Sequence, residues 1–155
     1  MNKIAQIYSS LFFVGYIKPA SGTFGTFFSI LIIFPLVKHL SPLSLVIIFF
    51  ILFIAAIKFI SLHSKNENSH DSSEIVIDEF LGVFFIMLFY EYFNFLNDLY
   101  MSIVIFFLFR IFDIVKPFPA RWIDEKMISS FGVILDDIIA GVYCVITLIL
   151  INAFF

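Results

Sequence analysis

The run from Pro42 to Leu62, PLSLVIIFFILFIAAIKFISL, constrains this chain more than any other segment, because Lys58 is its one charged residue. A helix that crosses the hydrocarbon core of a bilayer needs about 20 mostly apolar residues. The whole chain shares this preference, since 62% of its residues are hydrophobic and only 14% are charged, whereas soluble domains average about 45–50% and about 25%. We therefore expect a single all-helical membrane domain over residues 1–155.

Further apolar runs predict a multi-spanning bundle of about four to five membrane helices. These runs are Phe24–Leu40, Phe80–Leu96, Leu99–Val115 and Ile138–Phe155. The run that starts at Phe24 is the weakest candidate, because Pro35 would kink a helix there. The segment Ser64–Glu74 contains no hydrophobic residue and is expected to be a watery loop. Within it, His70 and Asp71 are either a proton-transfer pair or a solvated pair.

Positive charge predicts how such a bundle is oriented, because consecutive spans place successive loops on alternating sides. Of the lysines and arginines, only Lys38 falls on one side. The other side carries Lys3, Lys18, Lys58, Lys65, Arg110, Lys116, Arg121 and Lys126. This bias predicts that the second side faces the cytoplasm. We expect the short apolar stretch near the N-terminus to form a surface or entry helix rather than a cleaved signal peptide.

The same alternation brings four polar motifs to the cytoplasmic side. They are Lys18–Thr26 (KPASGTFGT), Asp78–Glu79, Arg110–Pro117 (RIFDIVKP) and Asp136–Asp137. An acid buried in a span costs about 2.5–3.5 kcal/mol even on the lenient insertion scale, whereas acids at one depth can share a cation and water. The grouping therefore predicts one site rather than scattered anchors.

Arg110, Asp113 and Lys116 recur every three residues, which places them roughly along one helix face, and Pro117 predicts where that helix stops. Arginine binds phosphate oxygens bidentately and lysine supplies a point charge. We therefore interpret Arg110 and Lys116 as phosphate-binding residues, with Asp113 as a metal ligand or base. The structural alternative is a snorkelling pair of cations with Asp113 as their partner.

The acidic doublets predict a metal site, because adjacent carboxylates repel each other unless a cation neutralises them. Hard cations such as Mg²⁺ take oxygen ligands from carboxylates, water and substrate phosphate. The candidate metal ligands are Asp78, Glu79, Asp113, Asp136 and Asp137, and Asp78, Asp113 and Asp137 are the candidate catalytic residues. The alternative for each doublet is a favourable acidic first turn of a helix.

The N-terminal motif offers small residues and hydroxyls at the start of an apolar helix, where free backbone N–H groups bind anions. The candidate substrate-binding residues there are Lys18, Thr23, Gly25 and Thr26. A plain helix cap by Ser21 or Thr23 is the alternative interpretation.

Four segments in this order resemble bacterial phosphatidylglycerophosphatase A: ASGTFGT, IVIDEFLG, FRIFDIVKPFP and GVILDDIIAG. Ser21 stands where that family has a proline, and the likeness runs from about Lys18 to Tyr143. The resemblance implies an all-helical, Mg²⁺-dependent lipid phosphatase of the bacterial inner membrane. Its substrate would be phosphatidylglycerophosphate and its products phosphatidylglycerol and phosphate. Membrane phospholipid is the expected partner, and no nucleic acid is expected.

Two other classes of protein compete with this interpretation. A transporter also carries intramembrane charges, but it predicts polar residues through the depth of the spans, whereas the acids here concentrate on one side. A non-catalytic assembly subunit would tolerate neutral substitutions of the acids. Among enzymes, a cysteine-nucleophile phosphatase would need arginine where Leu150 follows Cys144. Direct attack by water and an aspartyl-phosphate intermediate both remain open, as does the oligomeric state.

Overall fold

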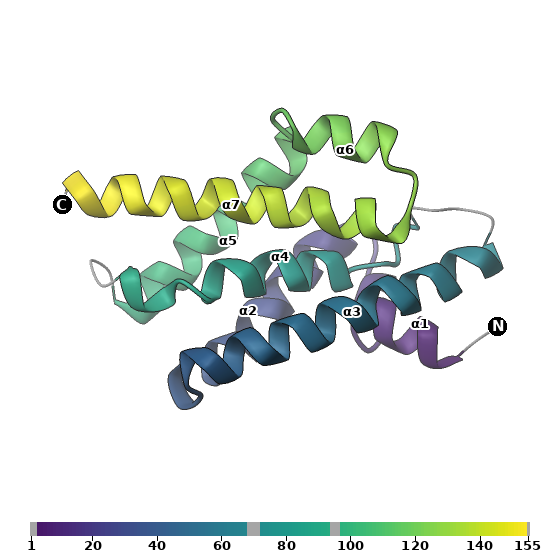
Figure 1. The fold of residues 1–155 in the computed structure, drawn as a ribbon, viewed down its shortest axis with the longest axis horizontal. Coiled ribbons are helices and arrows are strands. Elements are labelled where there is room, and N and C mark those ends of the chain that lie inside the picture. The colour runs from purple at the N-terminus through teal and green to yellow at the C-terminus, as the bar shows by residue number, and fades with distance from the viewer. Residues whose placement is uncertain (1–2, 68–71, 94–96, 155) are drawn as a thin grey trace.

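The structure, a computed structural model, describes residues 3–67, 72–93 and 97–154, and these form helices without any strand (Figure 1). Its α-helices are α1 (Lys3–Ser9), α2 (Ser21–His39), α3 (Pro42–Glu67), α4 (Ile77–Met87), α5 (Asp98–Val115), α6 (Ala120–Lys126) and α7 (Ser130–Phe154). Two short 3-10 helices, η1 (Val14–Tyr16) and η2 (Tyr90–Tyr92), complete the described elements. The prediction of an all-helical fold is confirmed. His70 and Asp71 lie outside the described residues.

Helix α4 lies at the centre of the bundle, between α3 and α7 in Figure 1, and it also packs against α2. Nearly all of its side chains are buried, including Leu81, Val83 and Phe84, which have no exposed surface. Phe109 of α5 and Leu148 of α7 meet it in the same core. The position of α4 therefore determines where its first-turn acids lie relative to the other helices.

Three helices are long and apolar enough to cross a membrane, namely α2, residues Pro42–Ser64 of α3, and α7. Many of their side chains are exposed and apolar, among them Leu31, Ile51 and Ile146, as expected of helices that face lipid. Helix α5 agrees with the predicted run Leu99–Val115 and ends just before Pro117, as predicted. The chain is thus a membrane protein of several apolar helices.

Two predicted boundaries differ from the structure. The run Phe80–Leu96 is not one continuous helix: α4 has 11 residues and ends at Met87. At about 1.5 Å per residue it is far shorter than a core of about 30 Å. Its apolar character comes from burial inside the protein, which a hydropathy pattern does not distinguish from burial in lipid. In addition, α7 begins at Ser130 rather than Ile138, so Asp136 and Asp137 lie within the helix instead of before it.

Helices α4 and α7 approach each other closely because each has a glycine at the contact. A Cβ atom on Gly82 would lie 2.6 Å from the Phe109 ring and 2.9 Å from the Asp137 carbonyl oxygen. A Cβ atom on Gly141 would lie 2.9 Å from the Gly82 carbonyl oxygen. Small residues let membrane helices approach in this way. This contact brings the acids of α4 beside those of α7.

We expect Gly82→Ala to lower the melting temperature of the protein in detergent. Alanine is favoured over glycine in a helix by about 1 kcal/mol, but here its methyl group would overpack against Phe109 and the α7 backbone. Overpacking costs about 1–3 kcal/mol, so the net effect should be destabilising. The matched control is Ile146→Ala on the outer surface of α7. A Gly82→Ala protein that melts at or above the wild-type temperature would contradict the close contact.

Candidate functional site

A polar cavity of about 150 Å³ lies at the end of the bundle where α4 and α7 begin and α5 ends, which we call the site end. Its lining residues are Ser21, Ser72, Ser73, Ile75, Asp78, Glu79, Asp113, Lys116, Asp124, Val133, Asp136 and Asp137. The lining includes every acid that the sequence predicted as a metal ligand. Segments that are far apart in the chain therefore meet in one cavity, as the grouping of charges predicted.

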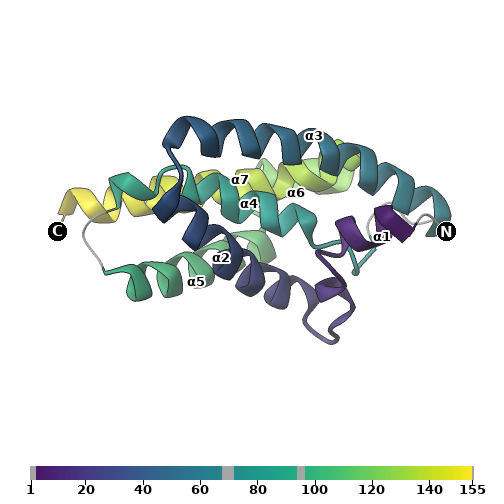
Figure 2. The same ribbon diagram turned by 90° about the horizontal axis from the view of Figure 1, so that it is seen from below.

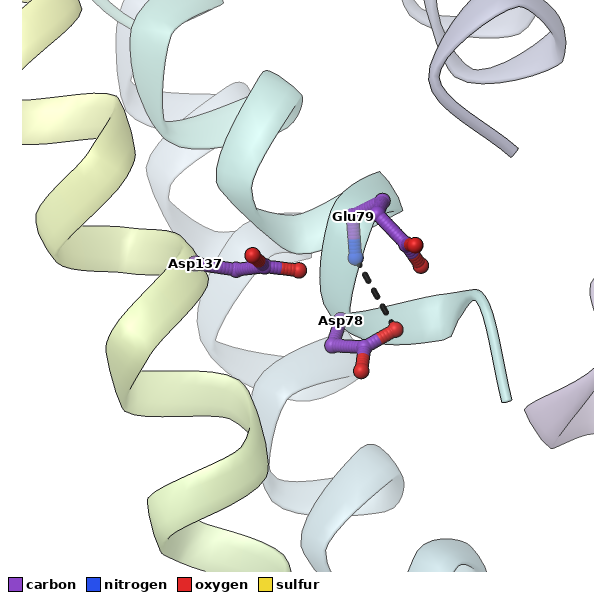
Figure 3. A group of neighbouring side chains, drawn as sticks. All are labelled: Asp78, Glu79 and Asp137. Atoms are coloured by element: carbon purple, nitrogen blue, oxygen red, sulfur yellow. Dashed lines mark hydrogen bonds between the residues drawn. The ribbon is translucent and has the colours of Figure 1, made fainter. Parts of the chain in front are cut away.

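Asp78, Glu79 and Asp137 form a compact group of acids in the cavity, with one carboxylate oxygen of each within 4.8 Å of the others. Figure 3 shows Asp137 extending from α7 towards the two acids in the first turn of α4. The backbone N–H of Glu79 donates a hydrogen bond of 3.0 Å to Oδ1 of Asp78, which orients that carboxylate. The group is thus held by backbone geometry on two helices.

These carboxylates need a counter-charge, because two unit charges about 4 Å apart repel by about 4 kcal/mol at an effective dielectric constant of 20. Two buried acid oxygens in the cavity, Oε2 of Glu79 and Oδ1 of Asp136, have no hydrogen-bond partner among the described residues. The donor atoms are all oxygens, the type that hard divalent cations such as Mg²⁺ select. The residues therefore fit a divalent cation.

Arg110 lies beside this group and joins it to α5. Its Nη1 atom is 2.5 Å from Oδ2 of Asp113 and 3.9 Å from Oε1 of Glu79. The Nε atom of Arg110 is buried without a hydrogen-bond partner among the described residues. Asp113 thus pairs with Arg110, as the structural alternative predicted, and it also lines the cavity.

The first turn of α2 packs directly on this charged pair. A Cβ atom on Gly22 would lie 2.3 Å from Oε1 of Glu79 and 2.9 Å from Nη1 of Arg110. Both atoms belong to side chains whose positions the site fixes, so any side chain at residue 22 would displace them. Gly22, the first glycine of the ASGTFGT segment, therefore allows the start of α2 to contact Glu79 and Arg110.

Lys116 lies beyond the end of α5, in the left-handed conformation with φ 45°, rather than on the helix face that the spacing predicted. Its Nζ atom is 2.7 Å from Oδ2 of Asp136 and 2.9 Å from Oδ1 of Asp124. Burial by itself would lower the pKa of Lys116, but the hydrogen bonds to Asp136 and Asp124 outweigh burial and raise it. The ammonium group therefore stays charged at neutral pH.

The other predicted binding residues do not line the cavity. Thr26 is buried, and its hydroxyl donates a hydrogen bond of 2.9 Å to the Gly22 carbonyl oxygen within α2. Gly25 packs against Val76, Thr23 is half-buried, and Lys18 is exposed. A role for these four residues in substrate binding stays a prediction.

Four polar lining residues escaped the sequence interpretation: Ser21, Ser72, Ser73 and Asp124. For Ser21 the sequence suggests no role beyond a possible helix cap. Asp124 lies in RWIDEK, where charges of both signs are typical of an exposed helix. Only the turn that folds α6 back against α7 brings it over the cavity. Pro117 predicted where the helix ends, but it did not indicate the direction in which the chain turns.

Most of the chain is similar to known proteins. The family model for phosphatidylglycerophosphatase A matches residues 7–152. The chain is 33% identical over 132 residues to phosphatidylglycerophosphatase A of Haemophilus influenzae, an alignment that covers 85% of this chain and 78% of the relative. It is 37% identical over 79 residues to the Escherichia coli protein of the same name, covering 51% and 44%.

A third relative, from Bacteroides thetaiotaomicron, is provisionally named a phosphatidylinositol-3-phosphatase. It is 44% identical over 75 residues, which cover 47% of this chain and 44% of the relative. No solved structure matches the chain significantly.

Lys116→Met should destabilise the folded protein because it leaves Asp136 buried without its cation. Breaking a fully buried ion pair costs about 3–5 kcal/mol, and this pair is partly solvated, so we expect a smaller loss. The measurement is the melting temperature in detergent. Adding Asp136→Asn removes the unpaired charge and should recover most of the loss. If the double variant melts no higher than Lys116→Met alone, the two residues are not coupled as described.

Proposed function

The chain belongs to the phosphatidylglycerophosphatase A family, and from this membership we propose its reaction and its setting. It is a phosphatase, and the proposed reaction removes the terminal phosphate of phosphatidylglycerophosphate with Mg²⁺ as cofactor. The proposed setting is the cytoplasmic face of the bacterial inner membrane. The observation that carries the proposal is the meeting of Asp78, Glu79 and Asp137 within 4.8 Å, beside Arg110.

This arrangement suits phosphoryl transfer, in which catalysis consists mainly of positioning and of stabilising charge on the phosphoryl oxygens. Asp78, Glu79 and Asp137 would hold Mg²⁺, which when bound neutralises charge on those oxygens and orients the phosphoryl group. Arg110 and Lys116 would bind the phosphoryl oxygens. Both cations are already fixed by acids of the cavity, which limits the reorganisation needed when substrate binds.

Asp113 is the proposed base. Its carboxylate lines the cavity and is held by Arg110, so it can accept a proton from a nucleophile that enters beside the phosphate. In the overall hydrolysis, a water oxygen forms a bond to phosphorus and the bond between phosphorus and the glycerol oxygen breaks. The glycerol oxygen takes up a proton, and the products are phosphatidylglycerol and inorganic phosphate.

The distribution of positive charge supports the proposed orientation. Exposed Arg121 and Lys126 on α6 lie at the site end, with α1, whereas Lys38 lies at the opposite end with the turn between α2 and α3 (Figure 1). Positive residues near membrane ends favour the cytoplasm. The cavity would then open where the phosphate headgroups of the inner leaflet lie.

The purified protein should release phosphate from phosphatidylglycerophosphate only when Mg²⁺ is present. Asp137→Asn should lower kcat by about 100-fold or more, as the loss of one electrostatic group often does. Glu125→Gln is the matched control, because Glu125 is an exposed acid of α6 that pairs with Arg121. Phosphatidylinositol 3-phosphate, the substrate class named for the third relative, should give a lower kcat/KM. Metal-independent release, or undiminished turnover by Asp137→Asn, would contradict the proposal.

The melting temperature of Asp137→Asn should also distinguish the effect of repulsion between carboxylates from the effect of metal binding. Without metal, the variant should melt above the wild type, because one of three mutually repelling carboxylates is gone. Mg²⁺ at 100 times its Kd should stabilise the wild type by about 2.7 kcal/mol, and this gain should be absent from the variant. Equal Mg²⁺-dependent shifts in both proteins would show that the ion binds elsewhere.

A further inference from the structure

A second cavity, of about 680 Å³, forms a groove between α2 and α5. These helices lie on the same side of the bundle, as Figure 2 shows. The groove is lined mainly by apolar side chains, including Phe27, Leu31 and Phe34 from α2 and Leu99, Ile103 and Phe107 from α5. Several of these side chains are exposed, Leu31 by 53% and Phe107 by 59%. In a membrane protein such a groove faces lipid.

The groove lies further along the same two helices that contribute Ser21 and Asp113 to the polar cavity. Ser21 of α2 and Asp113 of α5 line the polar cavity. Gly22 and Arg110 lie next to each other at its edge. At about 1.5 Å per residue, the groove starts about 5–8 Å further along each helix, at Phe27 and Phe107, and extends for about another 12 Å. The total depth below the cations is comparable to one leaflet, half of a core of about 30 Å.

At the end of the groove away from the site, Lys38, Asp98 and Tyr90 form a polar clasp that joins α2 to α5. Lys38 Nζ is 2.8 Å from Asp98 Oδ2, and the Tyr90 hydroxyl donates a hydrogen bond to the same carboxylate group. The Lys38 ammonium also lies 5.5 Å from the Phe34 ring centroid and 5.1 Å from that of Tyr90. A groove that begins near phosphate-binding cations and ends at this polar clasp suits one linear apolar ligand with a phosphate at its head.

We propose that this groove binds one acyl chain of the phospholipid whose phosphate occupies the polar cavity. The inference rests on the proposed function and specifies how the substrate lies. Moving a chain from the bilayer into the groove releases little hydrophobic free energy, because lipid tails are as apolar as leucine. The groove therefore acts by orientation: it aligns the headgroup with the cations, and a misplacement of about 1 Å can cost about 100-fold in rate.

The direct test uses a phosphatidylglycerophosphate analogue with a photoactivatable group near the end of one acyl chain, bound to wild-type protein in lipid nanodiscs with Mg²⁺. We expect labelling to concentrate on groove residues of α2 and α5. Unlabelled phosphatidylglycerophosphate should compete with it, whereas phosphatidylcholine of the same chain length should not. If the outer surfaces of α3 and α7, for example Ile51 and Ile146, are labelled as strongly as the groove, the inference is overturned. Dimers joined through Ile103→Cys would also overturn it, since a second copy would then occupy the groove.

A kinetic test uses Ile103→Trp, which fills the groove, and Ile146→Trp on the outer surface of α7 as its matched control. Ile103→Trp should lower kcat/KM for long-chain phosphatidylglycerophosphate by about tenfold or more. It should leave turnover of the dibutyryl analogue within about twofold, since that lipid has no chain to place. Equal loss on both lipids, or no loss on either, would overturn the inference. Phosphate release by the wild type reports on the proposed function separately.

Discussion

The structure depends on the cost of gathering like charges in apolar surroundings. Asp78, Glu79 and Asp137 lie within 4.8 Å of one another, at one end of a bundle made mostly of apolar helices. Such a group is stable in its ionised form only if cations compensate it. Arg110 and Lys116 supply part of that compensation through Glu79, Asp113, Asp124 and Asp136, and the proposed Mg²⁺ supplies the remainder. A phosphate substrate then enters a site whose charges are already arranged for it.

Close backbone contact makes this arrangement possible. The glycines Gly82 and Gly141 bring α4 and α7 together, and Gly22 brings the start of α2 against Glu79 and Arg110. The packing that buries the core thus also sets the distances between charges. Because helix association in a bilayer depends on packing rather than on transfer from water, these glycines serve both stability and the site. The groove between α2 and α5 adds the apolar half of the same amphiphilic site.

The sequence was sufficient to predict that Asp78, Arg110 and Asp137 lie at one site. Alternating spans place Asp78, Arg110 and Asp137 at one end, and the structure brings them together. The sequence did not predict that α4 is buried, because the run Phe80–Leu96 is as apolar as a lipid-facing helix. Nor did it predict that Lys116 leaves the helix face or that Asp124 lies over the cavity, since both depend on the direction of the turn at Pro117 and Pro119. Local sequence patterns predict where apolar helices lie. The burial of α4 and the positions of Lys116 and Asp124 depend on tertiary packing instead.

The central claim is that the acids of α4 and α7 jointly hold one divalent cation. Electron paramagnetic resonance tests it most directly, with Mn²⁺ as a paramagnetic substitute for Mg²⁺ that also accepts oxygen ligands. Titration of the purified protein should show one tightly bound Mn²⁺ per chain. That signal should be lost in Asp78→Asn and in Asp137→Asn, and Mg²⁺ should displace the ion. Binding that survives both substitutions, or no specific binding to the wild type, would contradict the account.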